Sequence, residues 1–214
     1  MTSPFPAIPT ADNLALLYQG LLTSIVRVCS GSAPIIDCDD FQKRIIDVLN
    51  TVEREAIRIG YSDQDVEDTN FAIVAFLDEA ILMSNDPSKT SWAPLQAKLY
   101  GKADSGEGFF ERLQALGKRR DSGQLIDVLE VYYLCLLLGY QGRYAGYAKA
   151  QSGELRQSMD DLRTRIEAVR GREMILSKPM AAPAPALSPA PSIDTVGRIL
   201  RLAAIAACGG LLLL

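Results

Sequence analysis

Residues 125–144 read LIDVLEVYYLCLLLGYQGRY, and this segment constrains the fold more than any other part of the chain. Its first half carries apolar residues at helical spacing on one face: Leu125, Val128, Leu129 and Tyr132. From residue 131 to 138 it is apolar on every face, so a helix here must be surrounded by other elements. The apolar run is shorter than the ~20 residues that a membrane-spanning helix needs. We therefore predict the central helix of a helical domain, ended by a left-handed glycine at Gly139.

The rest of the chain also favours helices. Apolar residues recur at helical spacing in five other segments, at about residues 13–28, 39–59, 62–82, 91–101 and 109–116. A further helix, a polar one, is expected at about residues 152–172. Side chains suited to capping a helix N-terminus precede three of them: Asp12 or Asn13, Ser62, and Ser91. No segment alternates polar and apolar residues as a strand would. The sequence thus predicts an all-α domain of about seven helices.

Composition changes sharply after the last predicted helix. Residues 178–192 read KPMAAPAPALSPAPS, which favours an extended linker. From residue 202 to 214 every residue is apolar or glycine. We predict a flexible N-terminus at 1–12, a helical domain at 13–175, a Pro/Ala-rich linker at 176–195 and a transmembrane tail anchor at 196–214.

Two arginines, Arg198 and Arg201, flank the predicted membrane helix. Arginines near a helix end can reach the lipid headgroups, and by the positive-inside rule they place the N-terminal domain in the cytoplasm. Small residues in the tail would allow a homodimer through the membrane helix. The alternative is an amphipathic tail that is buried or oligomerises, which would make the protein a soluble helical adaptor.

Composition excludes several function classes. The formal net charge is −4 and the pI about 5.0, which argues against a nucleic-acid binder. The sequence contains no histidine, which removes Ser–His and Cys–His catalysis and most zinc sites. No phosphate loop or dinucleotide fingerprint is complete, and none of the four cysteines forms a CxxC pair. We expect no cofactor, no metal and no enzymatic activity.

Asp78 and Glu79 lie inside an apolar helical stretch, where carboxylates are costly to bury without partners. Adjacent helix positions point ~100° apart, so the two do not form a single acid/base dyad. One interpretation is a helix-edge acid paired with an arginine of the same domain. A second is an acidic groove that receives another protein. A third, a hydrolase using Asp78, Glu79 and Glu107, would require a defined carboxylate separation.

The sequence also indicates which residues form the core. Trp92 is the only tryptophan and is interpreted as a core anchor. On the central helix we expect the core positions Leu129, Tyr132, Cys135 and Leu136.

Five motifs occur in one order along the chain: FLDEAIL at 76–82, Trp92 followed by PLQ at 94–96, LYG at 99–101, GEGFFERL at 106–113, and LEVYYLCLLLGYQGRY at 129–144. In this order they resemble the DotU/TssL family, also called IcmH. The resemblance covers most of the helical domain and is densest between residues 71 and 144.

This resemblance implies a structural subunit of the type VI secretion system in the bacterial inner membrane. It implies a cytoplasmic domain of two packed helical bundles and one C-terminal membrane helix. The implied partners are the membrane protein TssM (IcmF-like), the lipoprotein TssJ and subunits of the baseplate. The IcmH-like subunits of type IVB secretion systems remain an alternative.

The resemblance also places Asp78 and Glu79 in an acidic cleft. With them, Glu107 and Arg143 are the candidate residues for partner binding.

Overall fold

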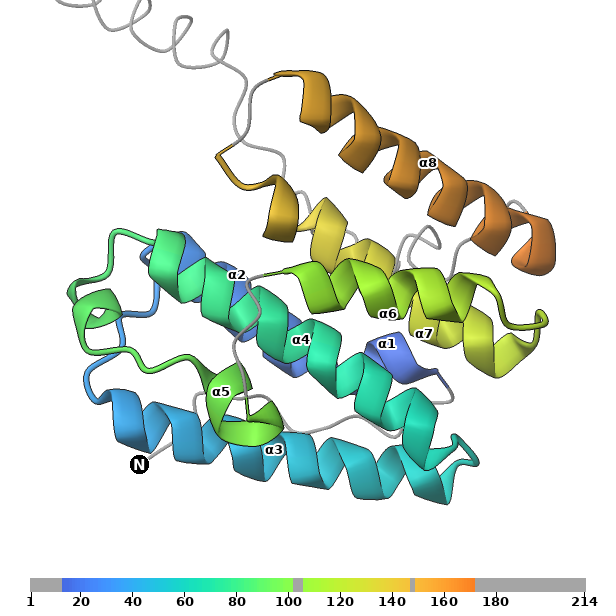
Figure 1. Ribbon diagram of the computed structural model, residues 1–214. Helices are drawn as coiled ribbons and strands as arrows, with labels where there is room; N and C mark the ends of the chain where they lie inside the picture. The colour runs from blue at the N-terminus through green and yellow to red at the C-terminus, as the bar shows by residue number, and fades with distance from the viewer. Residues whose placement is uncertain (1–12, 102–105, 147–148, 172–214) are drawn as a thin grey trace, which may run out of the picture. The chain divides into compact units, whose positions relative to one another are not determined.

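The structure, a computed structural model, describes residues 13–101, 106–146 and 149–171, and within these ranges it contains helices and no strand (Figure 1). The elements are α1 (Leu14–Leu17), α2 (Gln19–Cys29), α3 (Cys38–Arg58), α4 (Asp63–Met83), the 3-10 helix η1 (Pro87–Thr90), α5 (Leu95–Tyr100), α6 (Glu107–Gly117), α7 (Gly123–Leu137), the 3-10 helix η2 (Gly142–Tyr144) and α8 (Lys149–Arg170). The prediction of an all-α domain is confirmed. The predicted N-terminal segment, linker and membrane helix lie outside the described residues, as do Arg198 and Arg201.

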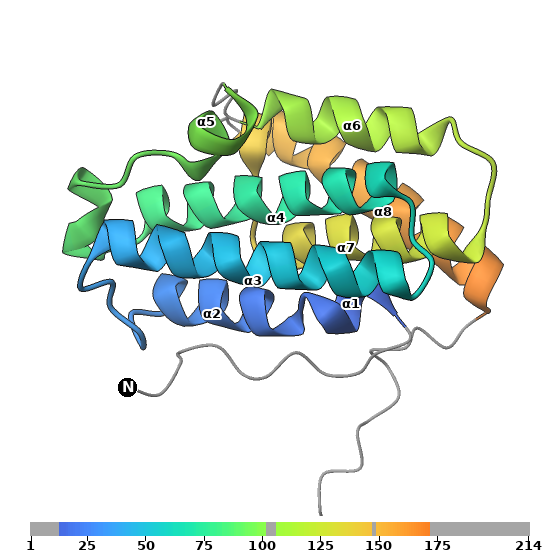
Figure 2. The same ribbon diagram turned by 90° about the horizontal axis from the view of Figure 1, so that it is seen from below.

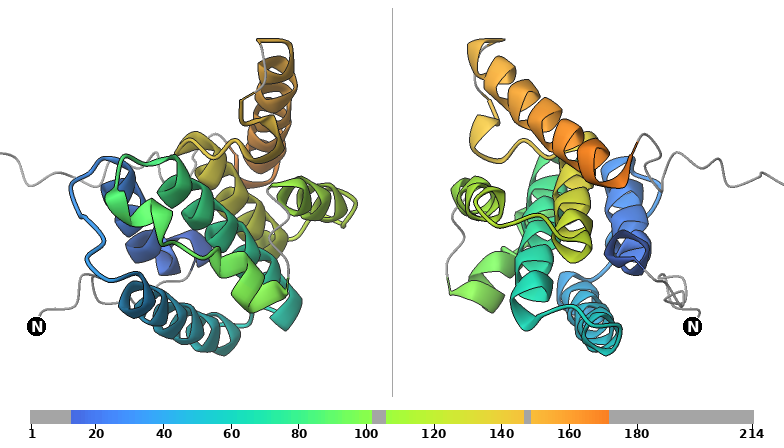
Figure 3. Two further views of the ribbon diagram at one scale, coloured as in Figure 1. Left: turned by 60° about the vertical axis from the view of Figure 1, so that its left-hand side comes forward. Right: turned by 90° about the vertical axis from the view of Figure 1, so that its right-hand side faces the viewer.

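Two helices, α4 and α7, form the interior of the domain. The hydroxyl of Tyr132 donates to the carbonyl oxygen of Asp68 at 3.0 Å, and the thiol of Cys135 lies 3.9 Å from the carbonyl oxygen of Ala72. The later residue of α7, Cys135, contacts the later residue of α4, Ala72. The two helices α4 and α7 therefore run parallel. Figure 3 shows α3 and α8 on opposite sides of this pair, and Figure 2 shows α3 and α6 on either side of α4. The sequence predicted one central helix; the structure has two.

The segment Gly123–Tyr144 is the one part of the described chain that is long and apolar enough to cross a membrane. Of its most apolar window, 67% is buried inside the domain. It is therefore the core helix that the sequence predicted. Its end differs from the prediction, because Leu137 and Leu138 are 50% and 40% exposed.

The predicted N-terminal helix at residues 13–28 is divided at Tyr18, which raises the number of described α-helices to eight. The Tyr18 backbone leaves the regular helical conformation (φ −85°, ψ −3°). Its buried side chain reaches α4, where the hydroxyl donates to Oδ1 of Asn70 at 2.6 Å. The predicted cap is confirmed, since Oδ1 of Asn13 accepts from the amide of Ala15 at 2.7 Å.

Of the other predicted caps, one is right and one is wrong. Oγ of Ser62 accepts from the amide of Asp65 and begins α4, as predicted. Ser91 instead follows η1, and α5 begins later, at Leu95, with no side-chain cap from its own N-terminal residue. The first amides of α5 are capped by a carboxylate from α4.

Helix α8 covers α7 with a small apolar face. Leu162 and Ile166 are buried, and Leu155 and Met159 are partly buried against the core. Arg165 connects α8 to the end of α6 and to the α6–α7 connection. Its guanidinium donates to Oδ1 of Asp121 and to the carbonyl oxygen of Gly117. Figure 1 shows α8 running in the opposite direction to α7.

Candidate functional site

The Asp78 carboxylate lies in the interior, where it accepts three hydrogen bonds. Its Oδ1 accepts from Nε1 of Trp92 and from the amide of Leu95, and its Oδ2 accepts from the amide of Gln96, each at 2.8 Å. Burial raises the pKa of this carboxyl, and the three donors oppose that rise. The two backbone donors are the first amides of α5. Asp78 is therefore the N-terminal cap of α5, supplied from a different helix.

Glu79 caps the start of a second segment in the same way. Its Oε1 accepts from the amide of Gln141 at 2.7 Å, and its Oε2 accepts from the amide of Gly142 at 2.6 Å. These amides begin η2, which follows the central helix α7. The side chain is partly buried, and this burial raises its pKa against the effect of the two amides.

The adjacent acids thus point to two separate segments, as expected for neighbouring helix positions. The interpretation as a helix-edge acid with an arginine partner was wrong: the partners are backbone amides and an indole. Asp78 is 4% exposed and offers no free carboxylate to another protein. Within the described part of the chain, no group of three or more acidic or sulfur ligands could hold a metal ion.

A contact between two glycines joins the start of α6 to η2. A Cβ on Gly106 would lie 2.3 Å from the Cα of Gly142, so only hydrogen fits there. Gly106 also has φ +91°, a conformation that favours glycine. The motifs GEGFFERL and GYQGRY therefore meet through their backbones.

Beside this contact, Glu107 and Arg143 form an exposed ion pair. Nη1 of Arg143 lies 3.0 Å from Oε1 of Glu107, and the side chains are 40% and 54% exposed. The guanidinium also donates to the hydroxyl of Tyr144 at 2.9 Å and lies 4.9 Å from the ring centre of Phe110. The hydrogen bond that Arg143 donates to Tyr144 raises the pKa of the guanidinium, and so does its pairing with the Glu107 carboxylate. The predicted site residues Glu79, Glu107 and Arg143 are thus brought together around η2.

A cavity of about 220 Å³ opens next to Glu79. Its walls include Pro94 and Tyr140 and two residues that sequence reasoning missed, Leu82 and Met83. These are 45% and 66% exposed. The sequence predicted an acidic cleft around Asp78 and Glu79. Both residues line this cavity, but its accessible lining is mainly apolar. The signal in the sequence is the apolar run Ile81, Leu82 and Met83, which directly follows the acidic pair and Ala80.

The predicted core residues are all buried: Trp92 is 5% exposed, Leu136 4%, and Leu129, Tyr132 and Cys135 0%. Trp92 is held by Asp78 and by the ring of Phe41, whose centre lies 6.1 Å away. Burial raises the pKa of the Cys135 thiol, which makes it a poor nucleophile.

Comparison with known proteins identifies relatives of this arrangement. The family described as "Type VI secretion system protein DotU" matches residues 13–214. The cytoplasmic domain of TssL from Acinetobacter baumannii is 30% identical, with a TM-score of 0.66; the match covers 75% of this chain and all of that one.

A second solved structure, SciP/TssL of the type VI system from enteroaggregative Escherichia coli 042, is 21% identical with a TM-score of 0.57. That match covers 68% of this chain and 84% of the other, and it supports the fold. A search of curated proteins found no match.

Proposed function

This chain belongs to the DotU family of type VI secretion system proteins, and on that premise we propose that it links the inner-membrane complex of the system to the cytoplasmic baseplate. Members of this family are membrane-associated structural subunits of the secretion apparatus. The observation that carries the proposal is the family match over residues 13–214, together with the 30% identical TssL domain. The family description names the type VI system, which favours it over a type IVB system.

We propose that the helical domain, residues 13–175, works in the cytoplasm. The Pro/Ala-rich residues 176–195 would connect it to a membrane helix at 196–214, flanked by Arg198 and Arg201. The solved relative from Acinetobacter baumannii is itself described as a cytoplasmic domain.

For the partners we propose the TssM-like (IcmF-like) membrane protein, the complex that contains TssJ, and a baseplate subunit. The surface around η2 offers them a charged pair, Glu107 and Arg143, beside the exposed apolar residues Leu82 and Met83. Glu79 would act by holding η2 in place, since both of its carboxylate oxygens accept amides of that segment. Asp78 would act only through α5.

The experiment is co-purification of the full chain from detergent-solubilised membranes of its host. Arg143→Glu places two acids side by side and should lower the recovery of the TssM-like protein or the baseplate subunit at least tenfold. Arg58→Glu is the control, because Arg58 also forms an ion pair with a glutamate at the surface, Glu55 on α3. Unchanged recovery of both partners, with normal secretion, would contradict the proposed surface.

The same material tests membrane association. Resistance of the full chain to carbonate extraction is expected for a transmembrane anchor. Release into the soluble fraction would instead support a soluble adaptor with an oligomerising tail.

A further inference from the structure

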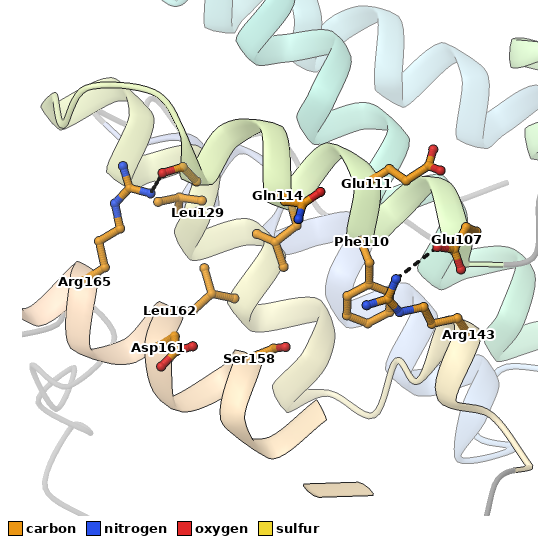
Figure 4. Close-up of a pocket in the computed structure, with 12 residues that line it drawn as sticks. Glu107, Phe110, Glu111, Gln114, Leu129, Arg143, Ser158, Asp161, Leu162 and Arg165 are labelled. Carbon is orange, nitrogen blue, oxygen red and sulfur yellow. Dashed lines mark hydrogen bonds and ion pairs between the residues drawn. The ribbon is translucent and has the colours of Figure 1, made fainter. Parts of the chain in front are cut away.

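A groove of about 490 Å³ lies between α6 and α8, on the surface of α7 (Figure 4). Both helices pack against α7, and Arg165 joins them at one end through its bond to the carbonyl oxygen of Gly117. The floor of the groove is apolar and is formed by Phe110, Leu113, Leu129 and Leu162. Elsewhere the two walls stay apart, which leaves this floor open to a third element.

The walls of the groove carry two acids that have no cationic partner among the residues that the structure describes. Glu111 on α6 and Asp161 on α8 both line it and are both exposed. Neither forms an ion pair with any residue in the described ranges; Asp161 accepts only a hydrogen bond from Gln157, at 2.8 Å. Figure 4 shows them on opposite walls, Glu111 on α6 and Asp161 on α8.

The two arginines of the groove do not neutralise these acids. Arg143 pairs with Glu107 at one end, and Arg165 pairs with Asp121 at the other, at 2.6 Å. Between these two pairs, the groove has an apolar floor and two carboxylates that form no ion pair with any described residue.

We propose that this groove binds an α-helix of a partner protein that carries a stripe of apolar side chains flanked by lysines or arginines. A helix fits a trough whose walls are themselves helices, and its apolar stripe would cover the floor. Flanking cations would meet Glu111 and Asp161, and this charge complementarity selects a basic helix over an acidic one. This surface and its chemistry lie beyond the proposed function, and the groove could take such a helix from any subunit of the secretion system.

The test is photo-crosslinking of the full chain in its host, with p-benzoylphenylalanine in place of Gln114, which lines the groove. The neighbouring exposed position Ala115, which is outside the groove lining, serves as the control site. The crosslinked segment is then sequenced by mass spectrometry. We expect a helical segment with Lys or Arg on both sides of an apolar stripe, and at least tenfold less adduct from position 115.

Two kinds of variant separate charge from shape. Glu111→Lys with Asp161→Lys should reduce the adduct at position 114 at least tenfold. Asp160→Lys with Glu53→Lys changes the charge by the same amount at exposed positions outside the groove and should leave the adduct intact. Ser158→Trp would fill the groove without a change of charge and should also abolish the adduct.

Several outcomes would overturn the proposal. These are an adduct to a second copy of this chain, to residues 172–214 of its own tail, or to a segment without basic residues. An adduct that survives the reversal of Glu111 and Asp161 would overturn it too, as would the absence of any adduct specific to position 114. The co-purification variant changes Arg143 at one end of this groove, whereas the variants here change Glu111, Asp161 and Ser158 and are read from the adduct at position 114. Loss of co-purification with an intact adduct, or the reverse, therefore distinguishes the failure of one proposal from the failure of the other.

Discussion

At the scale of single residues, Asp78 and Glu79 fix the positions of two segments that are distant in sequence. Each carboxylate binds the first free amides of a short helix, α5 for Asp78 and η2 for Glu79. The first amides of any helix have no acceptor within that helix, so an acceptor supplied by another segment helps to fix where these short helices lie. The acidic pair thus organises the surface that we propose for partners.

Asp78→Ala should destabilise the domain by about 4 kcal/mol, because it leaves the indole of Trp92 and two amides buried without acceptors. Glu79→Ala should cost only about 1–2 kcal/mol, since water can reach the partly exposed amides of η2. Urea unfolding followed by circular dichroism measures both. Equal losses would contradict this assignment, and Glu107→Ala, at an exposed ion pair, should stay within about 0.5 kcal/mol of the wild type.

Gly106→Ala tests the backbone contact between α6 and η2. Gly101→Ala is a matched control, because both glycines have positive φ (+91° and +77°) but only Gly106 has a neighbour in the way. The control should lose about 1 kcal/mol from its backbone conformation. Gly106→Ala should lose about 1–3 kcal/mol more, because the backbone of Gly142 must move. Thermal unfolding measures the loss of stability in both variants. Similar losses would show that the contact between Gly106 and Gly142 is not tight.

At the scale of an element, α8 is held by ion pairs as well as by packing. Its last residue, Arg170, pairs with Asp127 and lies 2.7 Å from Oε1 of Glu130 on α7. Burial raises the pKa of both carboxyls, and the charge of Arg170 opposes that rise. Asp127 also accepts from the hydroxyl of Tyr61. One arginine thus compensates two buried acids where α8 ends.

Arg170→Met should therefore destabilise the domain by about 3 kcal/mol at pH 7, because both acids remain buried without a cation. In an unfolded chain these carboxyls titrate near pH 4, and burial keeps their pKa higher in the fold. Above pH ~4 the folded state then binds more protons, so its stability falls as the pH rises through the folded pKa values. Without Arg170 those values rise further, and the deficit should shrink as the pH is lowered from 7 towards 4.

Urea unfolding of wild type and variant at pH 7, 5.5 and 4.5 measures this dependence. A deficit that is constant across the range would contradict it. As a control, Glu130→Gln leaves one acid with one arginine and should be tolerated at pH 7.

At the scale of the whole domain, the same cluster joins the two ends of the described chain. Nδ2 of Asn13, at the start of α1, donates to Oδ1 of Asp127 at 2.6 Å and to Oε2 of Glu130 at 3.4 Å. Arg170 binds these carboxylates from the last turn of α8. The buried residues therefore form one core that extends from α1 to α8.

A chain of residues 13–171 should consequently fold alone and unfold in one cooperative transition. A chain of residues 13–164 lacks Arg165, Ile166 and Arg170, so it should lose α8 and leave two acids uncompensated. Circular dichroism and thermal unfolding compare the two. Equal midpoints would mean that α8 does not belong to the cooperative core.

The sequence alone determined the class of fold and the family. A helix that is apolar on every face must be buried, so residues 131–138 predicted an interior helix. Local caps such as Asn13 and Ser62 were predictable because donor and acceptor lie a few residues apart. The order of five motifs identified the DotU family without any coordinates.

Only the tertiary structure decided what the motif residues do. The partners of Asp78 lie 14 to 18 residues away, and those of Glu79 and Arg170 lie at least 40 residues away. Helical periodicity records which face a residue occupies, but not which segment packs against that face. For this reason Ser91 was mistaken for a cap, Leu137 and Leu138 for buried residues, and the α6–α8 groove went unseen.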